Sequence, residues 1–216
     1  MTARITIATD HGELPALLDG ERGGTILALG HGAGGSKDDA LLEGFCRRLA
    51  DRGIASLRFD FPYRVRGTKA PDREPVLREA WLAVHAEAST VGDPVWIGGK
   101  SLGGRIASLV AADGLDIGGL VFVGYPLHPP GKPDRLRDAH LPDIKAPMLF
   151  LQGTRDAFAT WDLLEKTVGR LGSQAMMHPV EGGDHSFRVR GAKRDDAVTG
   201  ATLADVAADF IQDPPG

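Results

Sequence analysis

Hydrophobic residues along this chain form two kinds of pattern, alternation near the N-terminus and short continuous runs after it. Residues Arg4 to Ala8 alternate like a half-buried strand, and Leu14 to Leu18 can pair with them through a turn at His11-Gly12. The later runs are continuous, as is typical of central strands in a parallel sheet. They cover residues 25–29, 54–59, 95–97, 117–123, 148–151 and 174–180.

Between these runs, apolar residues recur at helical spacing. The stripes fall within residues 41–49, 76–84, 106–110, 161–171 and 203–210. We expect Ser36, with Asp39 three residues later, to cap the first helix, and Thr160 to cap the fourth. Strands that alternate with helices predict one α/β domain over residues 1–216. Its sheet should be mostly parallel, with an N-terminal antiparallel hairpin and helices on both faces.

The stretch from Tyr125 to Pro147 departs from this alternation. It holds six of the fourteen prolines and has no clear periodicity. We therefore expect an irregular segment that lies over the edge of the sheet. It is too short and too rich in proline to form a helical cap, so the fold should have no cap domain.

Composition narrows the choice of partners and compartment. A formal net charge of −4 gives no reason to expect a nucleic acid or an anionic membrane as partner. Cys46 is the only cysteine, which excludes an internal disulfide and a zinc-cysteine cluster. No apolar run reaches membrane-spanning length, and the N-terminus lacks the apolar core of a signal peptide. We expect a cytoplasmic protein with no metal and no cofactor.

One motif carries most of the chemical information, Gly99-Lys100-Ser101-Leu102-Gly103. It follows a strand pattern and precedes a helix pattern, which is the context of a nucleophile elbow. The sharp turn exposes the serine but crowds the backbone, so glycines are favoured two residues before and after it. A phosphate-binding loop would need a glycine where Pro94 stands. A purely structural glycine-rich turn remains the alternative.

Three further strand ends carry polar groups: the loop from His31 to Gly35, Asp156 and His185. In open α/β sheets, reactive groups gather at the carboxyl ends of the strands. The chain order is serine, then acid, then histidine, which is the order found in α/β-hydrolases.

On these residues the chain resembles the α/β-hydrolase superfamily over nearly its whole length. It is most similar to small, lid-less dienelactone-hydrolase-like members, the group that includes testis-expressed and chromatin-complex hydrolase-like proteins. Lys100 departs from commoner esterase motifs, which often carry histidine or aspartate there. The matching segments are Gly30-His-Gly-Ala-Gly-Gly35, Gly98-Gly-Lys-Ser-Leu-Gly-Gly-Arg105, Leu151-Gln-Gly-Thr-Arg-Asp156 and Gly183-Asp-His-Ser-Phe187.

The resemblance implies a role for each residue of the site. Ser101 would be the nucleophile, His185 the base and Asp156 the acid that orients the imidazole. The backbone N–H groups of Ala33 and Leu102 would form the oxyanion hole. Each assignment has a plainer alternative: a solvated loop histidine, a helix-capping aspartate, or an ordinary tight turn.

Several side chains near these strand ends are candidates for contact with substrate. They are His31 and Gly32 in the loop after the first parallel strand, Arg64 in the charged loop, and Tyr125. We expect His31 to shape its loop rather than to act as a base. Arg58, Arg64 and Arg66 could recognise an acidic substrate, although a solvated charged loop explains them as well. Lys100 fits a structural role, either paired with a buried carboxylate or with its amine in water.

The leading hypothesis is a serine hydrolase that cleaves a small ester or thioester through an acyl-serine intermediate. A catalytically weak or inactive interaction protein with the same fold is the alternative, because fold alone does not establish activity. A peptidase is a third possibility, but peptidases usually add a lid or propeller domain to select peptides, and no residues remain here to build one. The pattern leaves the acyl group, the leaving group and the oligomeric state open.

Overall fold

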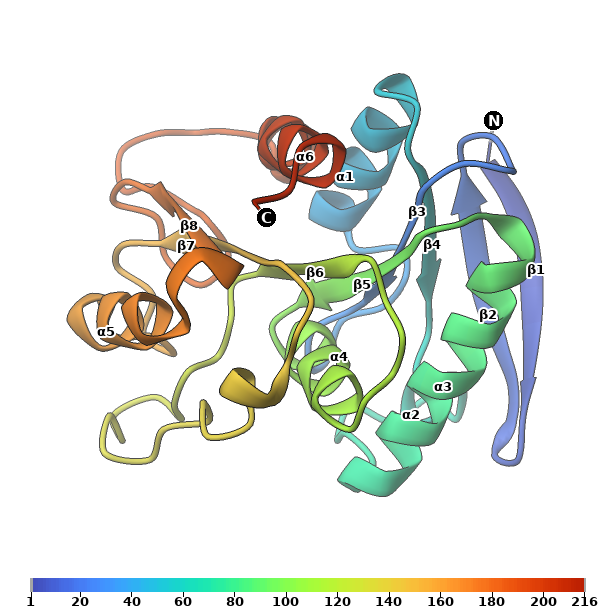
Figure 1. Cartoon of the computed structure of the whole chain (residues 1–216), viewed down its shortest axis with the longest axis horizontal. Helices are drawn as coiled ribbons and strands as arrows, with labels where there is room; N and C mark the ends of the chain where they lie inside the picture. The colour runs from blue at the N-terminus through green and yellow to red at the C-terminus, as the bar shows by residue number, and fades with distance from the viewer. Residues whose placement is uncertain (1, 216) are drawn as a thin grey trace.

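The apolar runs form eight strands of a single sheet (Figure 1). The computed structural model describes residues 2–215. The strands lie in the order β1-β2-β4-β3-β5-β6-β7-β8, and their bounds are β1 (Thr2–Thr9), β2 (Gly12–Asp19), β3 (Ile26–Gly30), β4 (Ala55–Phe59), β5 (Val95–Lys100), β6 (Gly119–Val123), β7 (Met148–Gly153) and β8 (Ala175–Val180).

Strand direction follows the two hydrophobic patterns. The alternating strands β1 and β2 pair antiparallel, and β2 pairs antiparallel with β4. The continuous runs, β3 to β8, pair parallel throughout. The predicted mostly parallel sheet with an N-terminal antiparallel hairpin is therefore confirmed.

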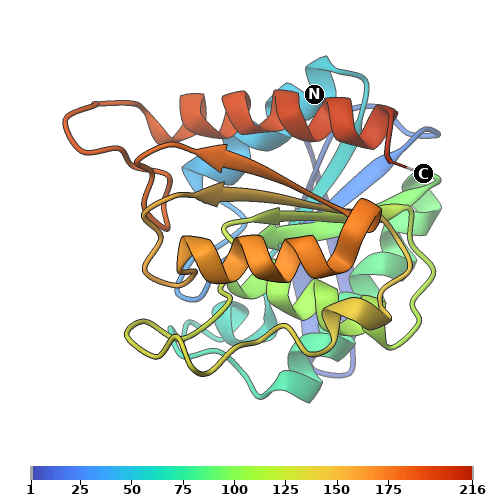
Figure 2. The same ribbon diagram turned by 60° about the vertical axis from the view of Figure 1, so that its left-hand side comes forward.

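Helices cover both faces of the sheet (Figure 2). They are α1 (Ala40–Asp51), α2 (Pro62–Val65), α3 (Glu74–Val91), α4 (Leu102–Ala112), α5 (Trp161–Leu171) and α6 (Asp196–Gln212), with 3₁₀ turns at Leu141–Asp143 and Gly172–Gln174. Helices α1 and α6 bury one apolar core, and α3, α4 and α5 bury the other. Neither face is left to solvent, which is why the central strands read as continuous apolar runs.

The segment between β6 and β7 is irregular, as predicted, but its position differs from the prediction. It packs over the sheet face that carries α4 and not over the sheet edge. Leu127, Leu141 and Ile144 join the core on that face, and His140 Nε2 lies 2.7 Å from Ser108 Oγ on α4. Apolar residues spaced irregularly along the segment anchor it there, which periodicity does not reveal. It forms no helical cap.

Parallel pairing brings the carboxyl ends of β3, β4, β5, β6, β7 and β8 to one edge of the sheet, with their loops above it. Among the residues that the structure describes, no helix is long and apolar enough to cross a membrane. The same part of the chain holds no cluster of histidine, cysteine and acidic side chains that could bind a metal ion.

Candidate active site

Ser101 stands alone between a strand and a helix. It follows β5 directly, and α4 begins at the next residue. Its backbone has φ 50° and ψ −111°, a conformation that non-glycine residues rarely adopt. A Cβ atom at Gly99 or at Gly103 would lie 2.1 Å from the carbonyl oxygen of Gly30 on the neighbouring strand. Only glycine permits this contact, which explains the spacing of the motif.

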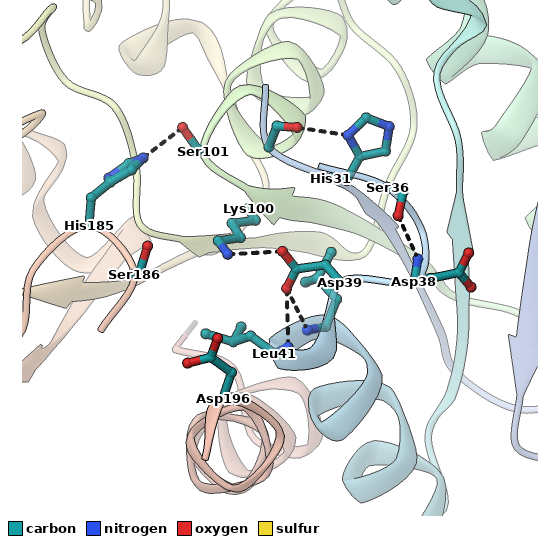
Figure 3. Close-up of polar contacts among 12 residues, drawn as sticks. His31, Ser36, Asp38, Asp39, Leu41, Lys100, Ser101, His185, Ser186 and Asp196 are labelled. Carbon is teal, nitrogen blue, oxygen red and sulfur yellow. Dashed lines mark hydrogen bonds and ion pairs between the residues drawn. The ribbon is translucent and has the colours of Figure 1, made fainter. Parts of the chain in front are cut away.

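Three side chains from three loops meet at this turn. His185 Nε2 lies 2.8 Å from Ser101 Oγ, and His185 Nδ1 lies 2.7 Å from Asp156 Oδ2. Figure 3 shows the imidazole of His185 turned toward the serine hydroxyl. The residues are separated by up to 84 positions in the chain. The three strand ends selected from the sequence thus converge on one line of hydrogen bonds.

Asp156 is held on all sides by donors. Its side chain is buried, and Oδ2 also accepts a hydrogen bond of 2.5 Å from Gln152 Nε2. Oδ1 accepts one of 2.7 Å from the backbone N–H of Phe158. Gln152 is held in turn, because its Oε1 accepts the backbone N–H of Tyr125 at 2.8 Å. Donors from strand β7, from the loop after it and from the loop after β8 therefore fix the plane of the carboxylate.

His185 sits at the tip of a short loop that Asp184 organises. Asp184 Oδ1 accepts the backbone N–H groups of Ser186 and Arg188 at 2.8 and 3.0 Å. The Asp184 N–H donates to the carbonyl of Arg188, and an isolated bridge joins Gly183 to Val189. The Asp184 carboxylate thus faces its own backbone and not the imidazole.

The loop after β3 lies beside the serine, and His31 fixes its shape. His31 is fully buried, and its Nε2 accepts the N–H of Phe61 at 3.2 Å. That bond assigns the ring proton to Nδ1, which donates to the carbonyl of Gly32 at 2.8 Å (Figure 3). Gly35 N–H donates to the same carbonyl at 3.0 Å. Burial lowers the pKa of His31 below its ordinary value of 6.5, which favours this neutral ring.

The anchored carbonyl has a consequence for Ala33. The Gly32 carbonyl and the Ala33 N–H belong to one planar peptide group, so they point in opposite directions. Two hydrogen bonds on the carbonyl therefore fix the direction of the N–H of Ala33, an exposed residue. A Cβ atom at Gly32 would lie 3.6 Å from Ser101 Cβ, which places this peptide next to the serine.

Lys100 forms an ion pair beneath the turn. Its Nζ lies 3.0 Å from Asp39 Oδ2, and Asp39 Oδ1 accepts the N–H groups of Leu41 and Leu42 (Figure 3). Asp39 is thus the N-cap of α1, and the prediction that Ser36 caps this helix is wrong. Ser36 Oγ instead accepts the N–H of Asp38. The pair ties the serine turn to the start of α1.

Two other sequence predictions need correction. Tyr125 is 1% exposed, and its hydroxyl donates to the carbonyl of Arg137, so the side chain belongs to the core and does not reach substrate. Thr160 precedes α5 without a side-chain capping bond, because its hydroxyl lies 3.0 Å from His128 Nε2.

Of the three arginines in and after β4, Arg58 and Arg66 form ion pairs with aspartates. Arg58 is buried against Asp19, and Arg66 pairs with Asp72. Arg64 is half-buried on α2, close enough for its charge to contribute to the lowered pKa of His31. Sequence reasoning assigned no role to Gln152 or to Phe158, whose ring stacks on the imidazole of His185. The only signal available was their position beside Asp156.

Comparison with known proteins identifies the family and the fold. Residues 23–212 match the family model described as "Alpha/beta hydrolase domain". The chain belongs to this alpha/beta hydrolase family. Dienelactone hydrolase from Anabaena variabilis is similar in structure, with 19% identity, 98% of this chain and 97% of that chain covered, and a TM-score of 0.73.

Two further solved structures share the fold. XC6422 from Xanthomonas campestris, described as an a/b serine hydrolase without lid, is 21% identical, with coverage of 98% and 92% and a TM-score of 0.64. Est1E from Butyrivibrio proteoclasticus, solved with ferulic acid, is 14% identical, with coverage of 96% and 98% and a TM-score of 0.76. At these identities the likeness concerns the fold of this alpha/beta hydrolase.

Proposed function

We propose that this alpha/beta hydrolase is a serine hydrolase that cleaves small esters or thioesters. The observation that carries the proposal is the line of hydrogen bonds from Ser101 Oγ through the His185 imidazole to the Asp156 carboxylate, with distances of 2.8 and 2.7 Å. Nucleophile, base and orienting acid within such distances are the signature of an activated serine. Ser101 is partly exposed and can therefore be reached by a substrate.

The first half of the reaction acylates Ser101. Its Oγ attacks the substrate carbonyl carbon while His185 Nε2 takes the hydroxyl proton. The carbonyl oxygen becomes an oxyanion, which the N–H groups of Ala33 and Leu102 stabilise. Leu102 is the first residue of α4, so its N–H has no acceptor within the helix. His185 then returns the proton to the departing alcohol or thiol, and Ser101 keeps the acyl group.

The second half releases the acid. A water molecule gives a proton to His185 Nε2 as its oxygen attacks the acyl carbon. The resulting oxyanion collapses, the bond to Ser101 Oγ breaks, and His185 returns the proton to Oγ. Asp156 stays ionised throughout and stabilises the imidazolium that forms twice in each cycle.

The loops around the site favour small substrates. The segment from Gly124 to Pro147 contributes one 3₁₀ turn and no helical cap, so the site should be an open cleft. An open cleft surrounds only a few methylenes of an acyl chain. Two of the similar structures carry the names of a dienelactone hydrolase and of a serine hydrolase without lid, which supports ester substrates and an open site.

A covalent probe separates this proposal from a non-catalytic protein. We expect a fluorophosphonate to label the wild-type protein at Ser101, and Ser101→Ala to abolish both the label and the hydrolysis of p-nitrophenyl acetate and acetyl thioesters.

Ser108→Ala is the matched control. Ser108 Oγ also lies 2.7 Å from a histidine, His140, but the residue is fully buried. Its replacement should leave labelling unchanged. A folded wild-type protein that takes no label, or a label that persists in Ser101→Ala, would refute the assignment.

A further inference from the structure

The ring of Phe158 lies against the imidazole of His185. The two ring centroids are 4.2 Å apart and the ring planes differ by 28°, a stacked arrangement. Phe158 is half-buried and comes from the loop after β7, whereas His185 comes from the loop after β8. The contact therefore joins the loop after β7 to the loop after β8.

The backbone of Phe158 is fixed on both sides. Its N–H donates to Asp156 Oδ1 at 2.7 Å, and its carbonyl accepts the N–H of His128 at 2.9 Å. His128 is itself buried, and its Nε2 accepts the N–H of Thr160 at 2.9 Å. Phe158 thus belongs to the same rigid loop as the carboxylate that binds His185.

Gly124 lies near another side of the imidazole. A Cβ atom at Gly124 would lie 3.7 Å from Cε1 and from Nδ1 of His185, which is van der Waals contact with the ring. Gly124 has φ 74°, so its backbone is held in a conformation that favours glycine. A side chain at position 124 would therefore contact the imidazole, whereas Phe158 is the residue whose ring stacks on it.

We propose that Phe158 is a positioning residue for the base: its ring holds the imidazole of His185 in line with Ser101 and stabilises the imidazolium. The inference rests on the proposed function, in which His185 becomes a cation twice per turnover. An aromatic face attracts a cation, and it attracts a neutral imidazole less. The stacking therefore favours the state of His185 that resembles the transition states.

The charged groups around His185 define what else could stabilise this cation. Asp156 binds Nδ1 directly. The Asp184 carboxylate is engaged by the N–H groups of Ser186 and Arg188. Phe158 therefore adds to the effect of Asp156, and its removal should reduce activity without abolishing it.

Phe158→Leu removes the aromatic face and retains an apolar side chain that still covers the imidazole. We expect kcat for p-nitrophenyl acetate to fall about fivefold to tenfold, with KM nearly unchanged, because the lost interaction acts on the cationic state. Phe158→Tyr keeps the aromatic face and should retain most of the activity.

Phe210→Leu is the matched control. Phe210 packs edge-to-face against Trp96 on the other face of the sheet, with centroids 5.8 Å apart. Thermal unfolding of all three variants checks that they are folded. If Phe158→Leu stays within twofold of wild type, or Phe158→Tyr is impaired as strongly as Phe158→Leu, the proposal is wrong.

A readout that needs no turnover separates this inference from the proposed function. Imidazole nitrogen resonances in histidine-labelled protein follow the protonation of His185 directly. With the aromatic face lost and the apolar cover kept, the titration midpoint of His185 should move to lower pH in Phe158→Leu. If the wild-type protein has no esterase activity but the midpoint still differs between wild type and Phe158→Leu, the proposed hydrolase function is refuted and the role of Phe158 is not. An unchanged midpoint would refute the role of Phe158.

Discussion

Replacing His31 by phenylalanine tests whether a buried side chain sets the oxyanion hole. The phenyl ring is flat and aromatic like the imidazole, although one ring atom larger, and it can keep the edge contacts with Phe61 and Tyr63, whose centroids lie 5.1 and 5.7 Å away. It removes both ring nitrogens. The change therefore deletes two hydrogen bonds, one to the carbonyl of Gly32 and one from the N–H of Phe61.

The cost in stability follows from which groups lose their partners. The N–H of Phe61 is left buried without an acceptor, which costs about 1–3 kcal/mol. The Gly32 carbonyl loses one bond but keeps the N–H of Gly35, so its contribution is smaller, about 1 kcal/mol. Together His31→Phe should lower the free energy of unfolding by about 2–4 kcal/mol, measured by urea denaturation.

The cost in activity follows from the peptide group that joins Gly32 to Ala33. Complete loss of one oxyanion donor costs about 100-fold to 1,000-fold in kcat. Because Gly35 still holds the Gly32 carbonyl, the N–H of Ala33 loses only part of its orientation, and we expect kcat to fall about 10-fold to 100-fold. KM should change little, since the oxyanion exists only after attack.

His178→Phe is the control for this substitution, because His178 is a half-buried residue of β8 away from the site. Steady-state kinetics with p-nitrophenyl acetate, on variants shown to be folded, give the comparison. If folded His31→Phe protein has a kcat within threefold of wild type, His31 does not orient the N–H of Ala33 through the Gly32 carbonyl, and the argument is refuted. An equal loss in His178→Phe would show that the effect is not specific to the loop.

The remaining predictions concern the hydrogen bonds that join Ser101, His185 and Asp156, the substrate cleft, and the dependence of stability on pH. His185→Ala should nearly abolish turnover, and Asp156→Asn should lower kcat far more than Asp184→Asn, measured with one ester; the reverse order for the two aspartates would exclude Asp156 as the acid. Across an acyl-chain series, kcat/KM should stop rising after a few carbons, since each further methylene gains about 0.8 kcal/mol only if it is buried; a rise through dodecanoyl esters would contradict an open cleft. Burial lowers the pKa of His31 and of His140. As the pH falls below 6.5, the unfolded chain therefore binds more protons than the folded protein, and the free energy of unfolding should decrease. A urea midpoint that is unchanged between pH 8 and pH 5 would contradict this.

The sequence was sufficient to predict which loops meet at the site. Ser101, Asp156 and His185 each follow a strand pattern, and parallel strands bring such positions to one edge. The glycine spacing around Ser101 was equally informative, because the close approach to Gly30 leaves no space for a side chain. These features depend on local pattern and on the rules of strand order.

The contacts that support the site were not predictable in the same way. Lys100 meets Asp39 across 61 residues, and Phe158 meets His185 between two loops. A pattern indicates that a residue lies at a strand end, but it does not give the direction of its side chain. Tyr125 shows this, since it lies two residues after the end of β6 yet turns into the core.

The hairpin of β1 and β2 lies outside the matched residues 23–212, yet its contacts extend through Arg58 to Lys37, two residues after the loop from His31 to Gly35. Its Asp19 neutralises the buried guanidinium of Arg58, which also donates to the carbonyl of Lys37 at 2.8 Å. Lys37 N–H in turn donates to Asp60. A shortened protein beginning at Gly23 would contain every residue of the proposed reaction, but it would leave Arg58 without its counter-ion. We therefore expect the proposed activity to require the first strands, because a truncation chosen from the family boundary alone would remove the partner of Arg58.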